Sequence, residues 1–174
     1  MNCNAPCFVL SLMQYSILNF MRSLHDKIWE AALNALKIRP QSVLEMKQKL
    51  GAKFPGEEEM TLKVIEEMQN VQLLNDRHFT EEFVHHLIQK PIGRIKIMVE
   101  TRRKGLDSNL VEQMLLNESW DEEASAERAI REKERLIHNE SDPRKRKAKF
   151  INFLRSRGFR DEVIYKTTAH SSPD

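Results

Sequence analysis

Basic side chains are concentrated in two stretches of this sequence. The segment from Arg144 to Arg160 contains eight basic residues and no acidic one. The segment from Lys90 to Lys104 contains six, with Glu100 as its only acid. Lysine ammonium groups attract phosphates as point charges, whereas arginine guanidinium groups can bind phosphates or carboxylates through two hydrogen bonds. The two stretches therefore predict contact with an anionic partner, and a merely solvated helix surface is the alternative interpretation.

The side chains expected to contact this partner all come from these two stretches. They are Arg94, Lys96, Arg102, Arg103, Lys104, Arg144, Lys145, Arg146, Lys147, Lys149, Arg155, Arg157 and Arg160. Nearby aromatic residues such as Phe150 and Phe153 fall at core positions of a helix, so base stacking is not expected and any DNA contact should be mainly electrostatic. Lys104 and Arg157 have an alternative role, because a cation near a helix C-terminus stabilises the helix dipole by about 0.3–1 kcal/mol.

Residues suited to catalysis or metal binding are sparse. His78, Glu82 and His86 recur at four-residue steps, which is acceptable metal-ligand spacing, but a solvated polar surface is the favoured interpretation. Cys3 and Cys7 lack further ligands for a structural zinc site. The sequence contains no HExxH motif, phosphate-binding loop or GxSxG motif. It therefore predicts no enzyme, no cofactor and no small-molecule substrate.

The composition favours helices for the body of the chain. Its 174 residues include 31% charged residues but only 5 Gly and 6 Pro, which is unlike a turn-rich β protein. The net charge of +2 is too small to indicate nucleic-acid binding by itself, so only the clustering of the cations is informative. Both cysteines lie in the first seven residues, so no disulfide framework can hold the body together. We therefore expect an all-α cytoplasmic protein.

Residues 8–21 form a mostly apolar segment that stands apart from the rest. No positive charge precedes it, no cleavage site follows it, and it is too short to span a bilayer comfortably. It is either an accessory segment, amphipathic or packed on the body, or an artefact of start assignment, because Met21 would make an ordinary beginning. Membrane association is not expected.

A helix must begin near Asn75 or Asp76, either of which can cap it. Phe79, Phe83 and Leu87 then recur every four residues, which predicts an apolar stripe along one side of this helix. The stripe must be buried against other elements.

Two further helices should follow and carry the first basic stretch. Pro91 suits the first turn of the second helix, Gly105 can end it in a left-handed conformation, and Asp107 or Ser108 can cap the third. The alternation of apolar and other residues over 95–99 is also typical of an exposed strand. A helix is preferred, because only a helix fits all three copies of the unit described below.

Capping signals predict more helices on both sides of this unit. Ser42 and Glu45 have capping-box spacing, and so do Ser119 and Glu122, which should open a long polar helix. Gly158 should end the helix that carries the second basic stretch.

Three segments, at 46–54, 99–106 and 152–159, end a middle helix in similar ways. Lys104-Gly105 and Arg157-Gly158 lie 53 residues apart, which is typical of a stacked helical array. We expect three three-helix repeats in an elongated, curved array. The predicted divisions are an extension of uncertain status over 1–21, repeats over 22–73, 74–118 and 119–169, and a disordered tail over 170–174.

Over roughly residues 25–168 the chain resembles the RecX family, regulators of the RecA recombinase. The resemblance is carried by the segments ALNALKIRPQSVLEMKQKL, LLNDRHFTEEFV, KPIGRIKIMVETRRKG and FLRSRGF, in this order and spacing. The sequence departs from the family at Lys53-Phe54, where a basic residue and glycine are usual, at Arg160, and over the first twenty residues.

The resemblance implies an elongated protein of three three-helix repeats that binds along the RecA filament on single-stranded DNA. It also implies that the protein damps growth of the filament, its ATPase and strand exchange, touching DNA directly or through the filament. We expect it to be a monomer. The alternative is an autonomous, electrostatic nucleic-acid-binding helical module that needs no protein partner.

Overall fold

The computed structural model describes residues 24–137 and 140–170, and these residues form nine helices and no strand. The first helix covers residues 24–38. The others are α2 (Val43–Lys53), α3 (Glu58–Asn70), α4 (Asp76–Ile88), α5 (Arg94–Arg103), α6 (Ser108–Asn117), α7 (Glu122–Ile137), α8 (Pro143–Ser156) and α9 (Asp161–His170). The prediction of an all-α fold is confirmed. The predicted extension over 1–21 and positions 171–174 of the predicted tail lie outside the described residues.

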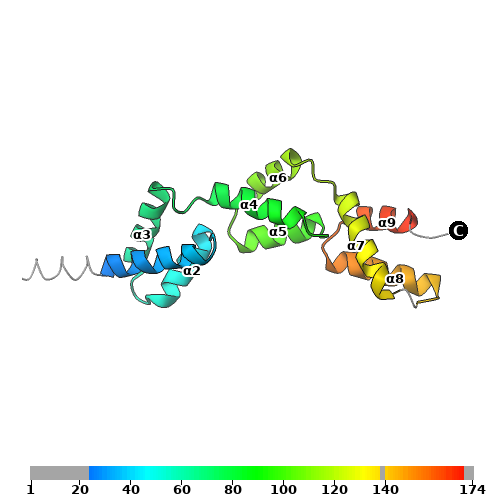
Figure 1. Cartoon of the computed structure of the whole chain (residues 1–174), viewed down its shortest axis with the longest axis horizontal. Helices are drawn as coiled ribbons and strands as arrows, with labels where there is room; N and C mark the ends of the chain where they lie inside the picture. The colour runs from blue at the N-terminus through cyan, green and yellow to red at the C-terminus, as the bar shows by residue number, and fades with distance from the viewer. Residues whose placement is uncertain (1–23, 138–139, 171–174) are drawn as a thin grey trace, which may run out of the picture. The chain divides into compact units, whose positions relative to one another are not determined.

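The helices are grouped by their contacts into sets that follow the chain (Figure 1). α2 packs on α3, while α4, α5 and α6 contact one another and α7, α8 and α9 do the same. Each set surrounds a separate hydrophobic cluster, built around Met46 in the first, Ile97 in the second and Leu154 in the third. This is the predicted helical-repeat fold. The chain also divides after Asn75 into two compact units, so the second and third sets share one unit.

Several local signals act as predicted. Ser42 caps α2 through its side chain, which accepts a hydrogen bond from the Glu45 N–H, and Glu45 bonds back to complete the capping box. Asp107 caps α6 by accepting from the Asn109 N–H at 2.8 Å. Gly105 and Gly158 adopt the left-handed conformation, with φ of 74° and 76°. Neighbouring residues alone decide these features.

Helix α5 explains the strand-like alternation of its sequence. Ile97 and Thr101 are buried, and the Thr101 hydroxyl donates to the Ile97 carbonyl at 3.0 Å. Ile95 and Val99 lie on the outer side and are exposed. The period of two therefore arises because branched residues occupy both sides of one helix, and the strand interpretation is wrong.

The predicted beginning of α5 at Pro91 is also wrong. Gly93 is the N-cap, and α5 begins at Arg94. The Gly93 N–H donates to the Arg157 carbonyl and the Ile95 N–H to the Gly158 carbonyl, both at 3.0 Å. A distant part of the chain thus binds the N–H groups at this helix start.

The predicted capping box of Ser119 and Glu122 does not form. Ser119 has a φ of 49°, and Asp121 caps α7 instead, accepting from the Glu123 N–H at 2.8 Å. Glu122 turns into the interior, because it binds groups from α5 and from the segment before α9. The capping role therefore passes to the residue before it.

Candidate functional site

The second and third helix sets meet where Gly93 lies against Gly158. A Cβ atom at Gly93 would be 2.3 Å from the Gly158 carbonyl oxygen, and one at Gly158 would be 2.5 Å from the Lys96 nitrogen. Cβ atoms essentially never lie so close to backbone atoms, so only glycine allows this backbone contact. We call the contact around Gly93 and Gly158 the α5–α8 joint.

Glu122 of α7 stabilises this joint. Its buried carboxylate accepts from the N–H of Arg94 at 3.0 Å, the N–H of Arg160 at 3.3 Å and the Nε of Arg160 at 2.7 Å. A buried carboxylate needs such partners, since an unpaired one would be costly to desolvate. The hydrogen bond to Glu122 raises the pKa of Arg160 above its usual range. The Arg160 side chain, predicted as a partner contact, is therefore engaged inside the chain.

Arg157 serves the same joint. Its guanidinium donates to the Pro91 carbonyl and to Glu132, both at 3.1 Å, and lies 4.7 Å from the centre of the Phe153 ring. Arg128, which lies outside both basic stretches of the sequence, donates to the Ile88 carbonyl at 3.1 Å. Arg128 binds a backbone carbonyl at the end of α4 and Arg157 one between α4 and α5, so they connect the second and third helix sets.

Most other predicted contact residues have partners in the second unit. Six form ion pairs at 2.5–3.8 Å: Arg94 with Glu112, Lys96 and Arg103 with Glu100, Arg146 with Glu134, Lys149 with Glu140, and Arg155 with Asp161. The Lys104 ammonium lies 5.8 Å from the centre of the Phe83 ring. The hydrogen bond from Lys149 lowers the pKa of Glu140, and Lys145 adds a smaller attraction. Exposed pairs of this kind are each worth about 0–1 kcal/mol, so a stronger anion could displace them.

Four predicted residues remain exposed without a hydrogen bond or ion pair from their side chains to other described residues: Arg102, Arg144, Lys145 and Lys147. The last three lie within the first five residues of α8, and we call them the α8 cation cluster. No acidic residue lies in the first turn of α8, whose start is capped by Asp142. Cations at this end oppose the helix dipole, so helix stability does not explain them. Lys145 is weakly attracted to Glu140, which Lys149 already pairs, so all three cations can bind an external anion.

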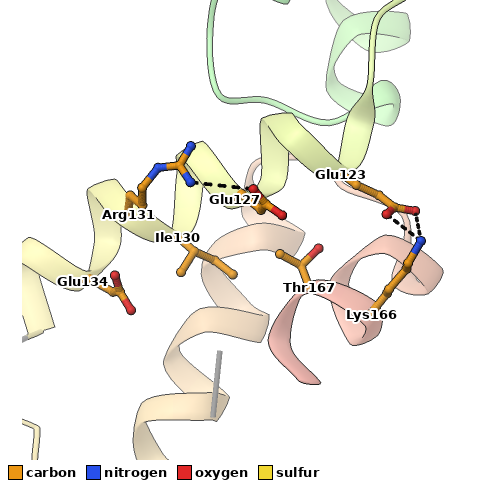
Figure 2. Close-up of a pocket in the computed structure, with 7 residues that line it drawn as sticks. All are labelled: Glu123, Glu127, Ile130, Arg131, Glu134, Lys166 and Thr167. Atoms are coloured by element: carbon orange, nitrogen blue, oxygen red, sulfur yellow. Dashed lines mark hydrogen bonds and ion pairs between the residues drawn. The ribbon is translucent and has the colours of Figure 1, made fainter. Parts of the chain in front are cut away.

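A groove of about 400 Å³ lies between α7 and α9, and Figure 2 shows its lining. Its charged groups largely satisfy one another: Lys166 lies 2.6 Å from Glu123, and Arg131 lies 3.7 Å from Glu127. The Thr167 hydroxyl donates to a backbone carbonyl of α9 at 2.7 Å. Of these contacts, only the Lys166–Glu123 pair joins α7 to α9, whereas the others lie within a single helix.

The predicted polar surface of α4 carries no assembled metal-ligand set. His78 lies 3.5 Å from Glu82, on an exposed side of the helix that also holds His86. Within residues 24–137 and 140–170, no three His, Cys, Asp or Glu side chains come together as metal ligands would. In the same part of the chain, no helix is both long and apolar enough to cross a membrane.

Comparison with known proteins gives consistent matches. A family model described as "RecX, second three-helix domain" matches residues 75–115. A "Regulatory protein RecX" of Pelodictyon phaeoclathratiforme is 33% identical over 134 residues, covering 76% of this chain and 81% of the relative. Its counterpart from Haemophilus influenzae strain PittEE is 30% identical over 131 residues, covering 75% and 85%. The chain belongs to the RecX family.

Solved RecX structures share the fold. The crystal structure of RecX from Lactobacillus salivarius has a TM-score of 0.68 at 21% identity, covering 84% of this chain and 95% of that one. A second crystal structure, of a regulatory protein RecX, has a TM-score of 0.72 at 18% identity, covering 83% of this chain and 73% of that one. The matched RecX domain contains Gly93 and Arg102, whereas Glu122 and the α8 cation cluster lie beyond it.

Proposed function

We propose that this protein binds the RecA recombinase filament on single-stranded DNA and mainly inhibits its ATPase, extension and strand exchange. The observation that carries the proposal is the α8 cation cluster, which is exposed, unpaired within the described chain and unfavourable for its own helix. Membership in a family of regulatory proteins supports regulation rather than catalysis. We expect the protein to act as a cytoplasmic monomer without cofactor or membrane.

The mechanism is occupation of several filament subunits at once. Proposed repeats over 22–73, 74–118 and 119–169 would each make modest contacts, and a linked second contact gains effective concentration over a separate one. The α5–α8 joint supports this, because it fixes the spacing of the α5 and α8 cations in one unit. Bound in this way, the protein caps the filament or competes with the next subunit.

The second candidate is an autonomous nucleic-acid-binding module. The α8 cation cluster favours it, because three free cations also attract the phosphates of bare DNA. Their attraction should be salt-dependent, with a log–log slope of about −0.7 per neutralised phosphate of a single strand. A recombinase filament offers carboxylates as well as phosphates, so it should be the tighter partner.

Binding to a fluorescent oligothymidylate, bare or coated with the cognate recombinase, separates the two candidates. We expect the coated strand to bind at least about tenfold more tightly at physiological salt, a difference of about 1.4 kcal/mol. Equal affinity for the two strands would contradict filament binding and favour the autonomous nucleic-acid-binding module. Binding of neither, by a chain shown to be helical by circular dichroism, would contradict both.

A further inference from the structure

The outer side of α5 presents a mixed apolar and cationic stripe. Ile95 and Val99 are 52% and 38% exposed, and Arg102 and Arg103 continue the stripe at helical spacing. The opposite side of α5 holds the buried Ile97 and Thr101. We call the first four residues the α5 outer stripe.

The fold gains little from the apolar half of this stripe. Branched side chains form helices less readily than alanine, and here they leave much of their apolar surface in water. Single exposed apolar residues are common and need no explanation. Ile95 and Val99 differ from these because they are one turn apart on the same side and are followed by a free cation, Arg102.

We propose that the α5 outer stripe docks on a protein, at an acidic surface that carries a small apolar groove. Aliphatic side chains neither bind phosphates nor stack on bases as aromatic rings do, so nucleic acid would leave Ile95 and Val99 without a partner. A protein groove would bury them, and Arg102 would bind a carboxylate about one helical turn, or about 5 Å, farther along. Arg103 already pairs with Glu100 and contributes less.

The occupant that fits is the recombinase subunit itself, and this choice rests on the proposed function. The α8 cation cluster and the α5 outer stripe would then bind different parts of the filament. The cluster, which is purely cationic, meets phosphates, whereas the stripe, which is half apolar, meets protein. Substitutions in the stripe should therefore weaken binding to the recombinase, and substitutions in the cluster should weaken binding to phosphates.

The test is the full chain with Ile95→Ala and Val99→Ala, titrated onto the recombinase-coated strand and onto the bare strand. Filament affinity should fall at least about tenfold, whereas affinity for bare DNA should not change. Circular dichroism should show unchanged or higher thermal stability, because alanine is the better helix former. Leu136→Ala, at a residue 74% exposed on α7, is the matched control and should bind like the parent.

The outcomes separate this proposal from the proposed function. Unchanged filament affinity of the double variant, with normal binding by the parent chain, would overturn the docking surface alone. No filament binding by the parent would overturn the proposed function and this proposal together. A photo-reactive benzoylphenylalanine at position 95 should crosslink to the recombinase, and crosslinking to the oligonucleotide instead would also overturn the docking surface.

Discussion

Replacing Arg144, Lys145 and Lys147 by glutamate should remove most of the inhibition of the recombinase ATPase without making the free protein less stable. The retained stability follows from the helix dipole. These residues lie at the positive end of α8, where each cation is unfavourable and each carboxylate favourable by about 0.3–1 kcal/mol. Thermal unfolding followed by circular dichroism should therefore show an unchanged or higher midpoint.

The loss of inhibition follows from charge. The three side chains have no hydrogen bond or ion pair in the described part of the chain, so their reversal removes only the weak attraction of Lys145 to Glu140. Each attraction to a phosphate or carboxylate, worth about 0.2–1 kcal/mol when exposed, becomes a repulsion of similar size. The concentration needed for half-inhibition should rise at least about tenfold.

A matched control separates local contact from net charge. Lys27, Lys37 and Lys63 are exposed cations of the first unit, outside both basic stretches. Changing them to glutamate alters the net charge by the same amount. We expect this control to inhibit nearly like the parent. Equal loss in both variants would show a general charge effect, and full inhibition by the α8 variant would contradict a role for the α8 cation cluster.

The Gly93→Ala substitution should strongly destabilise the second unit. The new methyl group would lie 2.3 Å from both the Gly158 oxygen and the Phe159 Cα, which are backbone atoms that cannot turn aside. The α5–α8 joint must open, and the hydrogen bonds of the Gly93 and Ile95 N–H groups are lost. Overpacking and these two bonds together predict a loss of about 2–6 kcal/mol in the free energy of unfolding, measured in urea.

Gly51→Ala is the control for this substitution. Gly51 lies inside α2, and a Cβ there would meet nothing within 4 Å. Alanine should stabilise that helix by about 0.5–1 kcal/mol, because glycine has more conformational freedom to lose on folding. If the Gly93→Ala chain were as stable as the parent, the close backbone contact at the α5–α8 joint would be contradicted, whatever the control shows.

The features predicted correctly from sequence are those decided by neighbours along the chain. Ser42 needed only Glu45, three residues away, to form its capping box. Gly105 and Gly158 needed only the end of their own helices. The buried Thr101 hydroxyl also finds its hydrogen-bond partner locally, because it donates to the carbonyl one turn earlier. Helical spacing and capping residues therefore specified most of the fold.

The features predicted wrongly or missed depend on residues far apart in sequence. Glu122 had capping-box spacing with Ser119, but it binds Arg160, which lies 38 residues later. Arg157 was expected at the partner surface, and it reaches a carbonyl 66 residues earlier. Helical spacing accounts for pairs within one helix, such as Lys96 with Glu100, but no local pattern marks a partner on a distant segment. The α8 cation cluster was easier to identify, because a run of basic residues without an acidic one is visible in the sequence.

The most direct test of regulation is the single-strand-dependent ATPase of the cognate recombinase filament, measured at fixed salt as this protein is added. We expect inhibition at far fewer than one molecule of this protein per recombinase subunit, because a regulator that caps filament ends stops growth from a few sites. No inhibition at excess, by a protein shown to be folded, would contradict regulation of the filament.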